Sequence, residues 1–472
     1  MQSKISLVEM LNWDAEFDVV IVGSGFAGLA AAVEAKNADA SVIIIEKRQT
    51  CGGNSIMSDG LLAVAGTPVQ QKEGIEDSPE LMYQDMLKAG RNYNNPQLAR
   101  IVAEQSNLTL KWLINDIGVQ LKDRVDQSGG HSVPRTHTPY NTSGTAIIKP
   151  FVTKAKELGI EIKTQTFLTR LLQDQDGAVK GVEINKHNHN EATQYIRAKK
   201  GVVLATGGFA GDVKLRTHQD PRLTQDIDDT NRSHSTAEAL LEAMNVGADS
   251  VHLDWIQVAP WTSPDERGYG IAPLFSSYTV FPYGVLIDPA TGKRFVNELA
   301  DRKTRTDAML KLSQPCIGIA DTQGMANSGQ NIDPYLKRKV VRKFSNLEDL
   351  STAYGLSCQV LRETLNCYNN YIENLLDEEF NKPIREYSQP IQPPYYAVRL
   401  WPKVHYTMGG LKINSQAQVM GLDNQPIQGL YAAGEVTGGI HGISRLGACA
   451  VTECLVFGRI AGKNVAISNN HS

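Results

Sequence analysis

The sequence has no long apolar run, no strong excess of one charge and no motif of paired cysteines. Its 472 residues carry 47 lysines and arginines against 51 aspartates and glutamates. This near balance gives no case for nucleic acid or an anionic membrane as a partner, because both require clustered positive charge. Apolar runs such as VVIVG are far shorter than the ~20 residues that cross a bilayer, and the start MQSKISLVEMLNWDAEF lacks a signal-peptide pattern. We therefore expect a cytoplasmic protein without membrane insertion or nucleic-acid binding.

The cysteines and the overall composition also exclude several classes of protein. The six cysteines form neither CxxC nor CxxCH, so the sequence predicts no metal site and no covalently attached haem. We find no internal repeat of the kind that builds solenoids. A chain of this length with 41% hydrophobic residues can bury a large core, and its length suggests two or three domains.

The segment FDVVIVGSGFAGLAAAVEAKNADASVIIIEK predicts a strand, a glycine turn, a helix and a second strand. Gly23, Gly25 and Gly28 follow the first strand with the spacing GxGxxG, which suits a tight turn, close approach of a pyrophosphate, and helix packing. Glu46 follows the second strand, where an acid can accept hydrogen bonds from an adenosine ribose. Together these features predict nucleotide binding of the Rossmann type.

Three more glycine-rich stretches lie outside this turn: CGGNS, VVLATGGFAG and GLYAAGEVTGG. Glycine-ended strands spread over most of the chain favour a long, extended ligand, and FAD fits that better than a nicotinamide nucleotide. The predicted FAD-binding residues are Gly23, Gly25, Gly28, Glu46, Gly52, Gly53, Asn54, Gly60, Thr206, Gly207, Gly208, Gly434 and Glu435.

Several motifs stand in the order found in one known family: AGRNYNNPQLARIVAEQS, TGKRFVNELADRKT, VHYTMGGLKI and GLYAAGEVTGGIHGISRLGA. Over residues 17–466 the chain resembles the flavoprotein subunits of fumarate reductases and succinate dehydrogenases, most closely the soluble flavin domain of fumarate-reducing flavocytochromes c. The resemblance implies an α/β fold in which a Rossmann-like FAD-binding domain, residues 1–251 and 405–472, is interrupted by an α+β capping domain, residues 252–404. It also implies a reaction site where the two domains meet. FAD should be held non-covalently, since no family-type histidine motif for attachment is seen.

The same resemblance assigns roles in catalysis. In this family a hydride passes from the flavin N5 atom to one alkene carbon while an acid protonates the other. Arg445 matches the arginine that grips the substrate carboxylate, and His405 matches a histidine that donates a hydrogen bond to it. Arg302 matches the arginine assigned to proton delivery, and we also expect it to bind the carboxylate. The family's second histidine is Tyr406 here, which can still donate a hydrogen bond.

Each of these residues also has a purely structural explanation. Arg445 could pair with Glu435 or Glu453, its nearest acidic residues in the sequence. Arg302 could pair with Glu298, four residues earlier on a possible helix. The histidine could be an ordinary, satisfied polar residue. We favour the ligand-binding roles because each residue lies within a family motif.

Two ionic features of the fumarate enzymes are replaced in this chain. Ala259 stands where they have a histidine for the second carboxylate, with Trp261 beside it. In the stretch SYTVFPYG, Tyr278 and Phe281 stand where the family has a glutamate and an arginine that reload the proton donor. Tyr278 either replaces that glutamate or packs on the substrate ring, and the sequence does not favour one role over the other. A second carboxylate buried here would lack a partner, at a cost of several kcal/mol. The predicted pocket residues are Ala259, Trp261, Ser277, Tyr278, Phe281 and Tyr406.

The sequence therefore predicts an FAD-dependent reductase of the C=C bond of an α,β-unsaturated carboxylate. The expected substrate is a monocarboxylate with an apolar or aromatic end, as in urocanate or arylacrylate reductases of the same superfamily. Two alternatives remain: a ketosteroid-type FAD dehydrogenase, and a flavin-binding electron-transfer protein without this activity. Because no haem motif or FMN-attachment domain is seen, electrons should come from a separate redox protein or a free reduced flavin.

Overall fold

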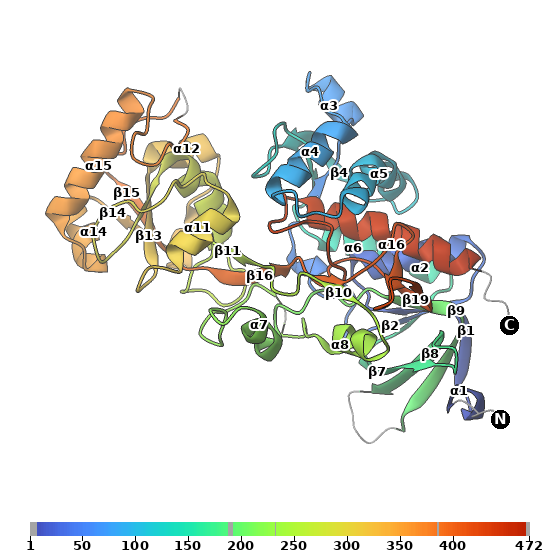
Figure 1. Ribbon diagram of the computed structural model, residues 1–472. Helices are drawn as coiled ribbons and strands as arrows, with labels where there is room; N and C mark the ends of the chain where they lie inside the picture. Colours follow the sequence, from blue (N-terminus) through green and yellow to red (C-terminus); the bar gives the residue numbers. More distant parts are fainter. Residues whose placement is uncertain (1–6, 187–191, 232, 385–386, 469–472) are drawn as a thin grey trace. The chain divides into compact units, whose positions relative to one another are not determined.

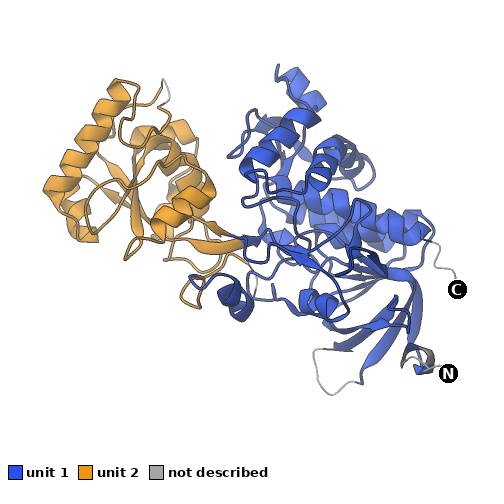
Figure 2. Cartoon of the chain, in the orientation of Figure 1, with its two compact units in different colours: residues 1–222, 232–256, 406–472 blue, residues 223–231, 257–405 orange. Residues whose placement is uncertain are grey.

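The computed structural model describes residues 7–186, 192–231, 233–384 and 387–468 (Figure 1). The chain folds into two compact units (Figure 2). Unit 1 comprises residues 1–222, 232–256 and 406–472, and unit 2 comprises residues 223–231 and 257–405. The predicted domain boundaries remain a prediction, because compactness does not test which parts fold by themselves.

Unit 1 contains a mixed sheet with a parallel centre. Its strand order is β18-β19-β9-β1-β2-β6, and β7 and β8 extend it because β8 also pairs with β9. β1 runs parallel to β2 and β9, and β9 runs parallel to β19. The strands are β1 (Ala15–Val22), β2 (Val42–Ile45), β6 (Glu161–Lys163), β7 (Thr166–Gln173), β8 (Val179–Lys186), β9 (Gln194–Leu204), β18 (Gln418–Met420) and β19 (Pro426–Ala432).

The carboxyl ends of the central strands meet at one edge of this sheet. Val22 is in register with Ile45 and Leu204, and Leu204 is in register with Ala432. A glycine-rich stretch or an acidic residue of the predicted FAD site follows each of these strand ends. The register therefore gathers motifs from distant parts of the chain at the place where ligands bind in open α/β sheets.

Helices pack against this sheet and against one another. α2 and α16 approach so closely that a Cβ atom added to Gly462 would lie 2.1 Å from the Ala31 carbonyl oxygen. α4 and α5 each begin with a proline that follows a capping residue, Ser78 or Asn95, and both cap side chains accept backbone N–H groups. The helices of unit 1 are α1 (Leu7–Met10), α2 (Phe26–Asn37), η1 (Ser55–Met57), α3 (Pro68–Lys72), α4 (Pro79–Ala89), α5 (Pro96–Asn115), α6 (Thr145–Glu157), α7 (Val213–Gln219), α8 (Glu238–Asn245) and α16 (Cys449–Ile467).

Several short strands form small sheets apart from the main sheet of unit 1. One three-stranded sheet has the order β3-β5-β4, and two pairs join β10 with β17 and β11 with β16. Their bounds are β3 (Leu62–Ala63), β4 (Leu121–Asp126), β5 (Thr136–Pro139), β10 (Ser250–Val251), β11 (Ile256–Ala259), β16 (Lys403–Thr407) and β17 (Gly410–Leu411).

Unit 2 is built around an antiparallel sheet with the order β12-β13-β15-β14. Its strands are β12 (Val285–Ile287), β13 (Cys316–Asp321), β14 (Val341–Phe344) and β15 (Tyr395–Leu400). Its helices are α9 (Ala272–Phe275), the π-helical η2 (Ser276–Val280), α10 (Phe281–Tyr283), α11 (Arg302–Met309), α12 (Thr322–Ser328), α13 (Asp333–Lys337), α14 (Leu347–Tyr354) and α15 (Cys358–Glu373). The predicted fold class, a parallel-centred α/β sheet interrupted by an α+β part, is thus confirmed.

Within the described residues, no helix combines the length and the apolar character that a membrane crossing would need.

Candidate cofactor and active site

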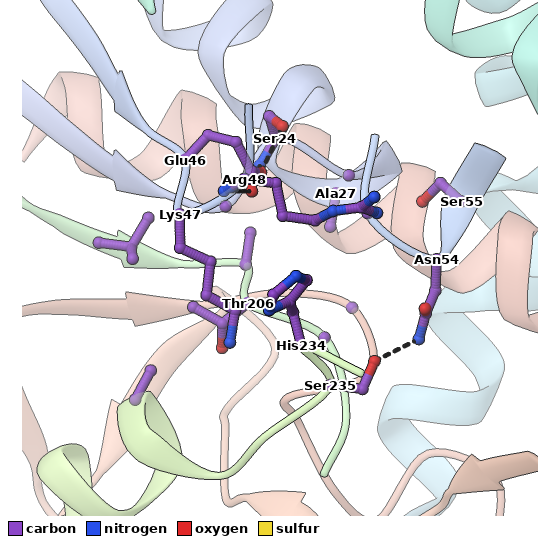
Figure 3. Close-up of a pocket in the computed structure, with 18 of the residues that line it drawn as sticks. Ser24, Ala27, Glu46, Lys47, Arg48, Asn54, Ser55, Thr206, His234 and Ser235 are labelled. Carbon is purple, nitrogen blue, oxygen red and sulfur yellow. Dashed lines mark hydrogen bonds between the residues drawn. The ribbon is translucent and has the colours of Figure 1, made fainter. Parts of the chain in front are cut away.

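A cavity in unit 1 lies at the carboxyl ends of the central strands (Figure 3). Its empty volume is about 1050 Å³, including space open to solvent, which is at the upper end for small-molecule sites. Most of the predicted FAD-binding residues line it: Gly23, Gly25, Glu46, Gly52, Gly53, Asn54, Thr206, Gly207, Gly434 and Glu435. The cavity thus brings together predicted residues from four separated parts of the chain.

The glycine turn has the geometry that its spacing predicts. Gly23 has φ +104°, and a Cβ atom there would lie 2.3 Å from the Ala205 carbonyl oxygen. A Cβ atom at Gly28 would lie 1.9 Å from the Gly23 carbonyl oxygen, so this glycine allows α2 to pack against the turn. Gly25 provides no side-chain cap for α2, and the Phe26 N–H donates to the Ser55 hydroxyl at 3.0 Å. The N–H groups that follow at this helix start suit an anionic ligand group.

Glu46 is held in place by the residue after the first glycine. One oxygen of its buried carboxylate accepts hydrogen bonds from the Ser24 backbone at 3.1 Å and the Ser24 hydroxyl at 2.5 Å. The other oxygen accepts the Arg48 backbone N–H at 2.8 Å. The carboxylate is therefore fixed at the cavity wall, where it can accept hydrogen bonds from a ribose.

Several cavity residues were not predicted from the sequence. The Asn54 side chain donates to the Ser235 hydroxyl at 2.7 Å (Figure 3). The Lys47 ammonium donates to the Thr236 hydroxyl at 2.8 Å. Arg48 also lines the cavity, and its buried Nη1 has no hydrogen-bond partner among the described residues. A cation with a donor left over fits a ligand that carries phosphate groups. The dipeptide Lys47-Arg48, directly after Glu46, was the available signal.

Three predicted cofactor residues do not line this cavity. Gly28 lies in α2, as described above. Gly60 has φ +71° and packs near Pro139, and a Cβ atom at Gly208 would lie 2.3 Å from both the Glu435 carboxylate and the Thr407 hydroxyl. These glycines allow backbone to pass close to its neighbours, and their contact with a cofactor remains a prediction.

Arg445 belongs to a buried polar cluster in unit 1. Its guanidinium carbon lies 4.4 Å from the centre of the Tyr406 ring. The Tyr406 and His441 rings pack edge to face, with their centres 5.8 Å apart. All three side chains are at least nine-tenths buried. Glu435 accepts the Thr407 backbone N–H at 3.0 Å, so the residue after the tyrosine ties the cluster to the cavity wall. The structure therefore brings Arg445 and Tyr406 together.

Glu435 and Glu453, the two acidic residues considered as partners for Arg445, both have a raised pKa. Burial raises the pKa of Glu435 to about 7, although the Thr407 hydrogen bonds and the charge of Arg445 act against this. Burial raises the pKa of Glu453 to about 8, and the nearby Glu435 adds to the increase. Near pH 7 these two carboxyls are therefore at least partly neutral. A neutral carboxyl leaves more of the arginine's charge available for a carboxylate ligand.

The raised pKa of Glu453 predicts a pH-dependent effect on stability. The folded protein holds this proton more tightly than the unfolded chain does, so the stabilisation is complete below about pH 4.5 and is lost as pH rises through about 8. Glu453→Gln keeps the neutral form at every pH. Its stability should match wild type near pH 5 and exceed it by on the order of a few kcal/mol at pH 9. Urea unfolding of the holoprotein at both pH values measures this; an equal difference at the two pH values would contradict it.

Arg302 and His405 belong to one cluster in unit 2. The Arg302 Nη1 atom donates to the Gln257 side-chain oxygen at 2.9 Å, and its guanidinium carbon lies 4.6 Å from the centre of the Trp261 ring. The Trp261 and His405 rings pack edge to face, with their centres 5.5 Å apart. The His405 Nδ1 atom lies 2.8 Å from the Thr230 hydroxyl oxygen. The indole of Trp261 therefore lies between the two predicted catalytic side chains.

The alternative role for Arg302 meets a structural obstacle. α11 begins at Arg302, because the Asp301 side chain caps it by accepting the Thr304 N–H. Glu298 lies before the helix, so a helical pair four residues apart is not formed there. Its buried carboxylate instead binds Arg294 at 2.8 Å and Lys382 at 3.5 Å.

The other predicted pocket residues lie in two neighbouring segments of unit 2. Ala259 ends β11 and is fully buried. Ser277 and Tyr278 lie in η2, and the Tyr278 side chain is 45% exposed. Phe281 is buried at the start of α10, beneath the guanidinium of Arg305. Gln257 and Thr230 were not predicted, since neither stands in a motif that the resemblance supplied.

Known proteins extend these observations over the whole chain. A family model described as an FAD binding domain matches residues 18–451. The acrylate reductase flavoprotein subunit of Shewanella woodyi is 40% identical over 467 residues, covering 96% of this chain and 92% of that protein. The urocanate reductase of Eggerthella lenta is 33% identical over 460 residues, covering 96% and 75%. The open conformation of a flavocytochrome c3 fumarate reductase superposes with a TM-score of 0.81 at 35% identity, covering 96% of this chain and 79% of that one.

The motifs, the glycine turn and the cavity at the strand ends agree with these relationships. The relatives are reductases, and the matched family model describes FAD binding. The chain therefore belongs to the FAD-binding fumarate reductase and succinate dehydrogenase family, and is an FAD-dependent oxidoreductase.

Proposed function

We propose that this oxidoreductase reduces the C=C bond of an α,β-unsaturated monocarboxylate whose far end is apolar or aromatic. The observation that carries the proposal is the placement of two arginines on aromatic rings, Arg445 on Tyr406 and Arg302 on Trp261. An aromatic face orients a guanidinium without neutralising it, so its N–H groups can still bind a carboxylate. The names of the acrylate and urocanate reductases support the same substrate class.

FAD, when bound, would supply the hydride for this reduction. Side chains of the protein bind the substrate carboxylate, stabilise the developing charge and deliver the proton. Arg445 binds the carboxylate through its planar fork and stabilises the negative charge that develops next to it. When the Thr230 hydroxyl donates to Nδ1 of His405, the ring proton stays on Nε2, which can then donate to a substrate carboxylate.

Arg302 delivers the proton that completes the reduction. An N–H bond of its guanidinium breaks, and the new C–H bond forms on the alkene carbon that did not receive the hydride. Arginine is a weak acid, with a pKa above about 12, so only a strongly basic carbanion accepts this proton. Gln257 and Trp261 hold the guanidinium in one orientation, which the transfer requires.

The proposed substrate has one carboxylate because its far end meets apolar side chains. Ala259 is fully buried, and Trp261 and Phe281 are 6% and 3% exposed. A second carboxylate against these three side chains would lose hydration and find no charged partner among them. Fumarate is therefore expected to be a poor substrate.

Adding a donor at this position should change the preference between acids. Ala259→His should improve fumarate binding by about tenfold or more relative to an aromatic acid, because a hydrogen bond to a charged group contributes about 1.5–3 kcal/mol. Ala259→Leu is the control, since it adds volume without a donor. Inhibition constants of both acids measure the effect. Equal changes for the two acids in Ala259→His would contradict the assignment of this position to the pocket.

The electrons are proposed to come from a separate redox protein or a free reduced flavin. One relative is named as a flavoprotein subunit, which supports a separate donor. FAD is proposed to be non-covalent and to be released when the protein is precipitated with acid.

A steady-state assay with a reduced dye as donor tests the function. The panel should contain acrylate, a cinnamate-like acid, urocanate, fumarate and a 3-ketosteroid. Turnover of at least one monocarboxylate, faster than that of fumarate, is the expected result. Turnover of the steroid alone would support a ketosteroid dehydrogenase. Failure of every acid to reoxidise the reduced flavin would support an electron-transfer protein.

A further inference from the structure

α11 carries a second arginine one helical turn after Arg302. Arg305 is only 9% exposed, and its guanidinium carbon lies 4.1 Å from the centre of the Phe281 ring. Its Nε and Nη1 atoms have no hydrogen-bond partner among the described residues. Burying a charged group without acceptors costs several kcal/mol, so a role beyond packing is expected.

The surroundings of Arg305 make its proton easier to remove. Burial lowers the pKa of this guanidinium to about 10, and the charges of Asp301 and Glu298 only partly oppose the shift. Glu298 is already bound by Arg294 and Lys382. Arg305 is therefore a better proton source near neutral pH than an arginine in water.

Arg305 is also placed to act on Arg302. Residues three apart on a helix lie on the same face, with Cβ atoms about 5–6 Å apart. The two guanidinium groups pack on different aromatic rings: that of Arg302 on Trp261 and that of Arg305 on Phe281. Both side chains therefore leave α11 from the same face, one helical turn apart.

The proton donor of the proposed reaction must be reloaded after each turnover. Once Arg302 has given its proton to the substrate carbon, its neutral guanidine is a strong base. Neither Gln257 nor Trp261, which orient it, can supply a proton near neutral pH. The segment that holds Tyr278 and Phe281 offers no guanidinium or carboxylate of its own between those residues.

We infer that Arg305 is the positioning residue that returns a proton to Arg302, an inference that rests on the proposed function. An N–H bond of Arg305 breaks as an N–H bond forms on Arg302, and water then supplies the proton that restores Arg305. No electrons move in this step. The guanidinium of Arg305 also repels that of Arg302 while both are charged, which favours release of the Arg302 proton toward the substrate.

The test compares Arg305→Met and Arg305→Lys with wild-type holoenzyme. Arg305→Met should lower kcat by about a hundredfold, the usual size of an acid–base contribution, while KM and product affinity stay within about threefold. Arg305→Lys should recover part of the rate, and its rate should fall at a lower pH than that of wild type as the lysine loses its proton. Guanidinium ion at millimolar concentration should partly rescue Arg305→Ala.

Arg342→Met is the matched control, because Arg342 is exposed and stands 5.0 Å from the centre of the Phe344 ring. Its kcat should equal that of wild type. A kcat of Arg305→Met within about twofold of wild type would overturn the inference. If Arg305→Met fails to fold, a rate and pH profile of Arg305→Lys identical to wild type would overturn it instead. Inactivity of wild type with every acid would refute the proposed function itself, which separates the two failures.

Discussion

Replacing Arg445 by methionine is expected to lower kcat/KM for an unsaturated acid by about a thousandfold or more. The guanidinium is the group proposed to bind the carboxylate and to stabilise the charge that develops in the transition state, and losing one such donor costs about 10²–10³ in rate. Product affinity should fall as well, since the same contact holds the ground state. Steady-state kinetics and product inhibition measure both effects.

Arg100→Met is the control for this substitution. Arg100 stands 4.1 Å from the centre of the Tyr83 ring, much as Arg445 stands on Tyr406, but its side chain is 44% exposed and pairs with Glu80. The control should keep wild-type kinetics. A rate for Arg445→Met close to that of the control, with FAD still bound, would remove Arg445 from the site.

Replacing Arg302 by methionine is expected to lower kcat by about 10²–10⁴-fold, the range for loss of a positioned acid. Product affinity should change less than in Arg445→Met, because proton delivery takes place only in the transition state. The primary measurement is kcat together with product affinity, with FAD content measured in the same samples.

Lys303→Met is the control on the same helix. Lys303 is the neighbour of Arg302 in α11, and it pairs with Asp307 at 2.7 Å. Its loss should leave kcat within about twofold of wild type. An unchanged kcat in Arg302→Met, or equal losses in both variants, would show that Arg302 does not deliver the proton.

The nucleotide-binding part of unit 1 could be predicted from the sequence because its signals are local. β2 and the second half of β1, residues 19–22, are buried on both faces, so they appear as continuous apolar runs. Gly23 adopts a conformation that few other residues tolerate. The starts of α4 and α5 were also predictable, since Ser78 and Asn95 each precede a proline.

Contacts between distant residues could not be predicted in the same way. Ser235 and Asn54 are hydrogen-bonded although they lie 181 positions apart in the sequence, and Thr230 and His405 are hydrogen-bonded at a separation of 175. Neither pair has a spacing that local periodicity could detect. The possible pairing of Arg302 with Glu298 failed for another reason. It required both residues to lie in one helix, but α11 begins at Arg302, after the Asp301 cap, so Glu298 lies outside it.

The burial of Arg305 could be recognised only from the structure. In the sequence it is one basic residue in the polar stretch RKTRTDAM, where a solvent-exposed charge is the ordinary expectation. The fold instead buries it on Phe281, at a position where the sequence showed only the loss of an expected arginine. A charge supplied by a different element cannot be recognised from an aligned motif.

The central claim is that arginine groups bind the carboxylate of an unsaturated acid so that reduced flavin can reduce its C=C bond. The most direct test is anaerobic mixing of reduced holoenzyme with acrylate or a cinnamate-like acid, and with the carboxamide of the same compound, while the oxidised-flavin absorbance is followed. The acid should reoxidise the flavin at least about a thousandfold faster than the neutral amide, because only the acid carries the charge that the arginines bind. Equal rates for acid and amide, or no reoxidation by either, would contradict the claim.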